Sequence, residues 1–135
     1  MVERGADVNA ADARMRQTPL MRAAASGKKE ITHALIANGA DLNSISTGGF
    51  QAIHFAALYG QKEIAEILID ENAQSQIAVS ELGSPFLIAL SEGHEAVARL
   101  LLSDEVDVYV RNSEGTTPLH EAAGAGMLNL TRDLV

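Results

Sequence analysis

The sequence predicts an all-α solenoid of stacked helix-turn-helix units. Two sets of small residues recur with an unbroken period of 33 residues. The first set is Gly27, Gly60, Gly93 and Gly126, and the second, four residues before each glycine, is Ala23, Ala56, Ala89 and Ala122. Self-similarity at a fixed period of this length is the sequence signature of repeat architectures, in which each unit contacts only its neighbours.

The first helix of each unit should begin nine residues before the glycine. The blocks there are Thr18-Pro19-Leu20-Met21, Gln51-Ala52-Ile53-His54, Ser84-Pro85-Phe86-Leu87 and Thr117-Pro118-Leu119-His120. A Thr or Ser side chain can accept hydrogen bonds from the free amides of a helix N-terminus. Proline is tolerated in the first turn, because the N–H that it lacks has no helical partner there. The glycine that follows allows the chain to reverse, so a short helix is expected between each block and its glycine.

A second helix should follow each glycine, because apolar residues return at helical spacing. They are Ile31, Leu35 and Ile36, then Ile64, Ile67 and Leu68, then Val97, Leu100 and Leu101. Helices this short are unstable alone and must stack on their neighbours. We therefore predict a single array over residues 1–135. It consists of the end of a preceding repeat with its finger (1–17), three repeats (18–50, 51–83 and 84–116) and a truncated last repeat (117–135).

The segments after the second helices complete a family pattern. Gly5-Ala6-Asp7-Val8-Asn9 and Gly39-Ala40-Asp41-Leu42-Asn43 lead into the next unit. With the Thr-Pro-Leu-His start at residue 117 and the glycine between helices, they make nearly the whole chain resemble the ankyrin repeat family. The resemblance implies L-shaped units with a projecting β-turn finger, stacked into a curved ankyrin-repeat solenoid whose main use is protein recognition.

Three places depart from this pattern. The first finger, residues 10–17, is one residue longer than its counterparts, and Leu82 stands where a turn glycine is usual, so both loops should deviate locally. Glu105 takes the place of Gly39, where a left-handed residue usually ends the second helix. We expect either a positive φ at Asp104 or Glu105, with strain of about 1 kcal/mol, or a different helix exit.

The C-terminal end of the predicted stack is apolar. Terminal units of a solenoid need a polar outer face, yet Leu128, Leu134 and Val135 should lie near an uncovered end. We expect end-on stacking or fraying there.

Composition excludes several classes of protein. The net charge of −8 opposes binding to nucleic acid, which depends on Lys and Arg neutralising phosphates. The absence of cysteine excludes disulfides and thiolate metal sites. No apolar stretch reaches the roughly 20 residues of a membrane-spanning helix, and no signal peptide is recognisable. These features predict an intracellular protein, cytoplasmic or nuclear, that does not bind membranes.

No arrangement of residues predicts catalysis or a bound metal. His54 and His120 hold equivalent positions two units apart, which places them about 20 Å from each other if helices stack at about 10 Å. They cannot share a metal ion, and each imidazole is expected to hydrogen-bond to the neighbouring finger backbone. No nucleophile–base set or carboxylate pair follows from the register. We therefore predict no enzyme activity and no cofactor.

The predicted function is to bind a partner protein on the concave side, which is formed by finger tips and first helices. The resemblance implies that partner-binding positions are Arg14, Met15, Gln17, Thr47, Phe50, Leu58, Tyr59, Glu81, Glu92 and Glu114. Residues 1–35 contain six Lys/Arg against four Asp/Glu, and residues 36–135 contain four against fourteen. The partner should therefore be apolar at its centre, acidic beside the first unit and basic beside the third and fourth. The alternative is a regulatory or substrate-selecting segment of a larger enzyme or channel.

Overall fold

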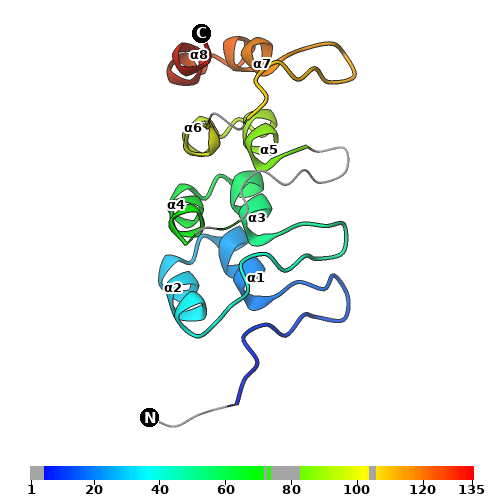
Figure 1. Cartoon of the computed structure of the whole chain (residues 1–135), viewed down its shortest axis with the longest axis vertical. Coiled ribbons are helices and arrows are strands. Elements are labelled where there is room, and N and C mark those ends of the chain that lie inside the picture. The colour runs from blue at the N-terminus through cyan, green and yellow to red at the C-terminus, as the bar shows by residue number, and fades with distance from the viewer. Residues whose placement is uncertain (1–4, 72, 74–82, 104–105) are drawn as a thin grey trace.

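The computed structural model describes residues 5–71, 73, 83–103 and 106–135, and α-helices occur there in four consecutive pairs (Figure 1). The pairs are α1 (Pro19–Ser26) with α2 (Lys29–Ala37), α3 (Ala52–Tyr59) with α4 (Lys62–Asp70), α5 (Pro85–Ser91) with α6 (Glu95–Leu101), and α7 (Pro118–Gly124) with α8 (Leu128–Leu134). The predicted all-α solenoid is confirmed.

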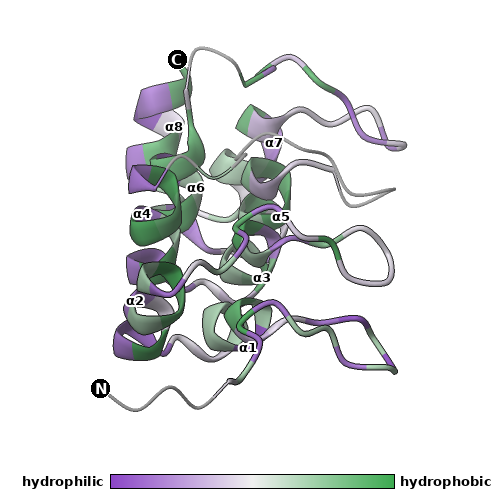
Figure 2. Ribbon diagram, turned by 60° about the horizontal axis from the view of Figure 1, so that its bottom comes forward, coloured by the Kyte–Doolittle hydropathy of each residue, from purple (hydrophilic) through white to green (hydrophobic). Residues whose placement is uncertain are grey.

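The pairs form two columns of helices. The first helices α1, α3, α5 and α7 lie in one column, and the second helices α2, α4, α6 and α8 lie in the other. The described loops that lead into α1, α3 and α7 project as fingers beside the first column (Figure 1). Hydrophobic residues face the interior, whereas the outward sides of the second helices are largely hydrophilic (Figure 2). The molecule therefore has a finger side, an outer side and two ends.

The N-termini of the first helices are capped as the sequence predicts. The Thr18 hydroxyl accepts a hydrogen bond from the Met21 amide at 3.3 Å, and the Thr117 hydroxyl accepts one from the His120 amide at 3.4 Å. In return, His120 Nδ1 accepts from the Thr117 amide at 3.1 Å. His54 Nδ1 does the same for the Gln51 amide at 2.9 Å. Within the described residues, the hydrogen bonds of His120 thus go to Thr117 at the start of its own helix, which corrects the predicted bond to a neighbouring finger.

The repeated glycines end the first helices in a left-handed conformation. Gly27 and Gly60 have φ of 70° and 68° and close α1 and α3. An added Cβ would lie 2.5 Å from the Gln61 side chain at Gly27, and 2.5 Å from the His94 ring at Gly60. Both positions therefore require glycine for backbone conformation and for space.

Side chains from the next pair reach the carbonyl groups at these turns. Gln61 Nε2 donates to the Ala25 carbonyl at 3.0 Å, and His94 Nε2 lies 3.1 Å from the Leu58 carbonyl. A carbonyl only accepts, so His94 must carry its proton on Nε2. The residue at the equivalent position of the fourth pair is Met127, a buried thioether that has no proton to donate. The last two pairs are joined by an ion pair of Arg99 in α6 with Asp133 in α8, at 2.7 Å.

Neighbouring pairs enclose a continuous apolar core. The four repeated alanines are all buried, so one first helix can approach the next closely. Larger buried side chains fill the space on either side of them, namely Leu20, Ile53, Ile64, Leu68, Phe86, Val97, Leu101 and Leu130. This shared core fixes the spacing of the fingers.

The first and fourth fingers turn differently. In the fourth, the Gly115 amide donates to the Asn112 carbonyl at 2.9 Å, with φ of 80° at Gly115. In the first, the Asp12 carbonyl accepts from Arg16 at 3.1 Å, one residue further along the chain. Arg16 therefore takes the left-handed conformation, with φ of 56°, that glycine takes in the shorter finger. The predicted deviation of the first finger is confirmed.

Two expectations concern residues outside those that the structure describes, namely the helix exit at Asp104 and Glu105 and the turn at Leu82. At the C-terminal end, Leu128 and Val135 are exposed, whereas Leu134 packs against the core. The expectation of apolar residues near an uncovered end thus holds for two of its three side chains.

Candidate protein-binding surface

The finger side of the stack brings together most of the positions predicted to bind a partner. Within the described residues, four exposed side chains come from fingers: Arg14, Met15, Thr47 and Glu114. Two more exposed side chains, Tyr59 and Glu92, lie at the ends of the first helices α3 and α5. Gln17, Phe50 and Leu58 are half-buried, and Glu81 lies outside the described residues.

The first two fingers are joined at their tips. The Thr47 amide donates a hydrogen bond to the Met15 carbonyl at 2.9 Å. The Met15 side chain nevertheless stays 45% exposed. The bond therefore fixes the relative positions of the two tips and leaves a flexible, polarisable side chain available for contact.

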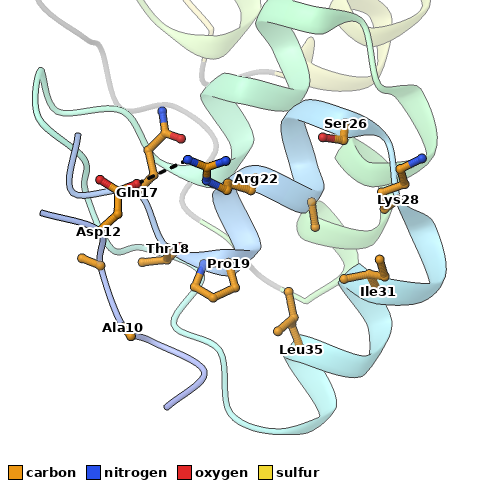
Figure 3. A pocket seen from close by; sticks show the side chains of 12 residues that line it. Ala10, Asp12, Gln17, Thr18, Pro19, Arg22, Ser26, Lys28, Ile31 and Leu35 are labelled. Carbon is orange, nitrogen blue, oxygen red and sulfur yellow. Dashed lines mark ion pairs between the residues drawn. The ribbon is translucent and has the colours of Figure 1, made fainter. Parts of the chain in front are cut away.

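One carboxylate organises the first finger. Asp12 Oδ1 accepts hydrogen bonds from the amides of Arg14, Met15 and Arg16, at 3.1, 2.7 and 3.1 Å. These bonds, that from Met15 foremost, hold the pKa of the Asp12 carboxyl below its ordinary value of 3.8. Asp12 Oδ2 also lies 3.8 Å from the Arg22 guanidinium (Figure 3). The carboxylate thus holds a loop that contains two exposed arginines.

The two aromatic residues predicted to bind a partner, Phe50 and Tyr59, lie at opposite ends of α3. The Phe50 ring packs near the helix start, 6.0 Å from the His54 ring and 5.5 Å from that of Phe55. Tyr59 is the last residue of this helix and is 54% exposed. Seven residues of helix correspond to about 10 Å along the axis. Phe50 therefore packs against the rings of α3, whereas Tyr59 projects an accessible ring.

Charge varies along the surface. Arg14, Arg16 and Arg22 are exposed at the N-terminal end, whereas Glu92 and Glu114 are exposed further along. The Glu114 amide donates to Asn112 Oδ1 at 2.8 Å, which orients this finger tip. A partner that lies along the fingers would meet positive charge first and negative charge later.

The described residues offer no site for a metal and no membrane span. They contain no group of three or more His, Cys, Asp or Glu side chains that could hold a metal ion. No helix among them is both long and apolar enough to cross a membrane.

Sequence reasoning missed several residues that the structure places in prominent positions. Gln61 and His94 join neighbouring pairs, and Asp12 shapes the first finger. Tyr109, at the end of a turn, is largely exposed. The sequence does hold a signal for the shared role of Gln61 and His94, because both stand one residue after a repeated glycine.

Comparison with known proteins agrees with this architecture. The family description "Ankyrin repeats (3 copies)" matches residues 1–81, and "Ankyrin repeats (many copies)" matches residues 86–135. These are units of a class of helical repeat modules that bind proteins and have no catalytic role of their own. The chain belongs to the ankyrin repeat family.

The proteins to which the chain is similar are much longer than the chain itself. The chain is 30% identical over 129 residues to a transient receptor potential cation channel subfamily A member 1 homolog of Caenorhabditis elegans, covering 95% of the chain and 11% of the channel. It is 31% identical over 133 residues to neurogenic locus notch homolog protein 1 of Mus musculus, covering 87% of the chain and 5% of that protein. A third relative, the ankyrin repeat and KH domain-containing protein mask-1 of Caenorhabditis elegans, is 28% identical over 122 residues, which are 89% of the chain and 5% of the relative.

Proposed function

We propose that this chain binds a partner protein on the surface formed by its finger tips and the exposed ends of its first helices. The observation that carries the proposal is the accessible pair of Met15 and Tyr59, 45% and 54% exposed, on a scaffold whose fingers are fixed by backbone hydrogen bonds. Methionine and tyrosine offer large contact areas, and tyrosine is enriched among the residues that dominate binding energy. A rigid scaffold lowers the entropy cost of association.

The charges on this surface suggest the chemistry of the partner. It should be apolar where it meets Met15 and Tyr59, acidic opposite Arg14 and Arg16, and basic opposite the exposed glutamates Glu92 and Glu114. Charged groups at a rim mainly accelerate encounter and fix orientation. Reversal of Glu92 to Lys should therefore slow association, and added salt should reduce the difference.

The proposal is tested by capture of a partner with the isolated chain, followed by kinetics on variants. Tyr59→Ala should weaken binding by about 2 kcal/mol, or roughly 30-fold, through faster dissociation. The matched control is Glu63→Ala, which changes an exposed residue on the outer side of α4. If the control abolishes binding while Tyr59→Ala and Met15→Ala bind like the parent, the partner uses the outer side instead.

A second candidate function is a regulatory segment of a larger enzyme or channel. It is supported by similarity to a cation channel homolog of which the aligned segment is 11%. In this case the captured partner would be another part of the same polypeptide. Binding of the isolated chain to separately expressed segments of its own full-length protein distinguishes this function from recognition of a different protein. Residence inside the cell, in the cytoplasm or nucleus, remains part of the proposal.

A further inference from the structure

The second and fourth fingers have different turns at their tips, residues 46–49 and 112–115. In each, the glycine amide that closes the turn donates to the carbonyl three residues earlier, at 2.9 Å. The third residue of the turn is Gly48 in the second finger, with φ of 94°, and Glu114 in the fourth, where φ is negative. A turn with a positive φ at its third residue only is type II, and one with negative φ at both central residues is type I. The second finger therefore has a type II turn and the fourth has a type I turn.

The two turn types differ in the direction of one peptide group. The N–H and C=O between the second and third residues of the turn exchange directions when type I becomes type II. In the fourth finger the Glu114 amide points to the side chain that starts the turn, and it donates to Asn112 Oδ1 at 2.8 Å. In the second finger the Thr47 carbonyl points there instead, and it accepts from the Ser46 hydroxyl at 3.2 Å. These two side-chain bonds agree with the reversal that φ indicates.

The reversed peptide group leaves one amide available at the tip of the second finger. The Gly48 N–H points away from the Ser46 side chain, and none of the described residues accepts a hydrogen bond from it. Gly48 is exposed, and neither Gly48 nor Gly49 has a side chain that would keep another molecule away from this donor. A positive φ strains residues other than glycine. Glycine at position 48 therefore both permits the reversal and leaves the amide accessible.

Positive charge lies beside this donor. The Thr47 amide donates to the Met15 carbonyl at 2.9 Å, so Gly48 and Arg16 each follow a member of the bonded pair. Arg14 and Arg16 are both exposed. Hydrogen bonds to an ionised acceptor are stronger than those to a neutral one. An anionic acceptor is thus favoured over a neutral one at this tip.

We propose that the Gly48 amide donates to a carboxylate side chain of the partner protein, and that Arg16 of the neighbouring tip pairs with the same carboxylate. The inference rests on the proposed function of the finger side and adds the chemistry of one contact. One carboxylate oxygen can accept several backbone amides, as Asp12 Oδ1 does within the first finger. The fourth finger lacks such a donor, because the Glu114 amide is bonded to Asn112.

NMR of the free chain tests the turn without a partner. In a type II turn the α-proton of the second residue lies close to the amide proton of the third, whereas in a type I turn the two amide protons lie close together. The parent should therefore show a strong NOE between the Thr47 α-proton and the Gly48 amide. In Gly48→Ala an NOE between the two amides should replace it, because alanine is strained at positive φ. A type I pattern in the parent would overturn the proposal.

Binding to the captured partner tests the contact. Gly48→Ala should weaken binding by about tenfold, the loss expected for a hydrogen bond to a charged group. The matched control is Gly39→Ala, which lies outside the finger tips and should bind like the parent. Gly39 has φ of 89°, and no atom lies within 4 Å of the added Cβ. Alanine in place of the recognised Asp or Glu of the partner should remove the effect of Gly48→Ala, as a double-mutant cycle measures.

The outcomes separate this contact from the proposed function. If Gly48→Ala binds like the parent while Tyr59→Ala is weakened, the finger side remains the binding surface and the Gly48 contact is wrong. If Gly48→Ala loses the same affinity toward every Asp→Ala and Glu→Ala variant of the partner, the acceptor is not a carboxylate side chain and the proposal fails. If neither Gly48→Ala nor Tyr59→Ala is weakened, both the contact and recognition on the finger side are wrong.

Discussion

The same amino acid has opposite environments at two equivalent places in this stack. Ile64 lies between two helix pairs and is 1% exposed, whereas Ile31, 33 residues earlier, is 53% exposed at the end of the stack. Both belong to short second helices that follow a left-handed glycine. The difference shows that burial in this architecture is decided by the neighbouring unit and not by the unit itself.

The largest expected effect comes from alanine at these two positions. Ile64→Ala should lower the free energy of unfolding by about 2 to 5 kcal/mol, because it opens a cavity between pairs. Ile31→Ala should stay within about 1 kcal/mol of the parent, because half of the side chain already contacts water. Chemical denaturation measures both. Equal losses would contradict the exposure of Ile31 at the end of the stack.

A smaller difference should separate two glycines. Gly60→Ala should cost about 2 to 3 kcal/mol, because alanine is strained at φ of 68° and its Cβ would displace the His94 ring from the Leu58 carbonyl. Gly93→Ala should cost about 1 to 2 kcal/mol, because φ is 80° but no atom lies within 4 Å of the added Cβ. Thermal unfolding of the two variants ranks them, and a more stable Gly60→Ala would refute the tight contact.

The smallest effect should distinguish the first finger from the fourth under acid. The lowered pKa of Asp12 means that its carboxylate stabilises the finger above pH 3.8, and that this contribution is lost as the pH falls below that value. The fourth finger uses Asn112 in the same place, and an amide does not titrate. Backbone NMR shifts should therefore change at Arg14 to Arg16 and not at Thr116, whose amide donates to Asn112 Oδ1, as the pH is lowered from about 5 to about 2, a range that extends below the ordinary carboxyl pKa. If the shifts changed equally in both fingers, titration of Asp12 would not be their cause.

Local chemistry explains why the helices could be predicted from the sequence. Thr18 and Thr117 cap their helices through their own side chains, and Gly27 and Gly60 reverse the chain through their own backbones. Such signals act within a few residues and recur every 33, so each copy supports the others. The repeat period therefore gave both the helices and their stacking.

Contacts between units were beyond this reasoning. The position that joins neighbouring pairs is filled by Lys28, Gln61, His94 and Met127 in turn. Gln61 and His94 each contact a backbone carbonyl 36 residues earlier, those of Ala25 and Leu58. In the candidate site, the sequence grouped Phe50 with Tyr59, but only the structure separates a ring that packs on His54 from one that is accessible.

Hydrogen exchange of the chain with its captured partner tests the central claim about function most directly. The account predicts slower exchange on binding at the finger tips, residues 12–17 and 46–50, and at the end of α3 around Tyr59. The amides of α2 and α4 on the outer side should exchange at the rate of the free chain. Protection confined to α2 and α4, with unchanged exchange in the fingers, would contradict recognition on the finger side.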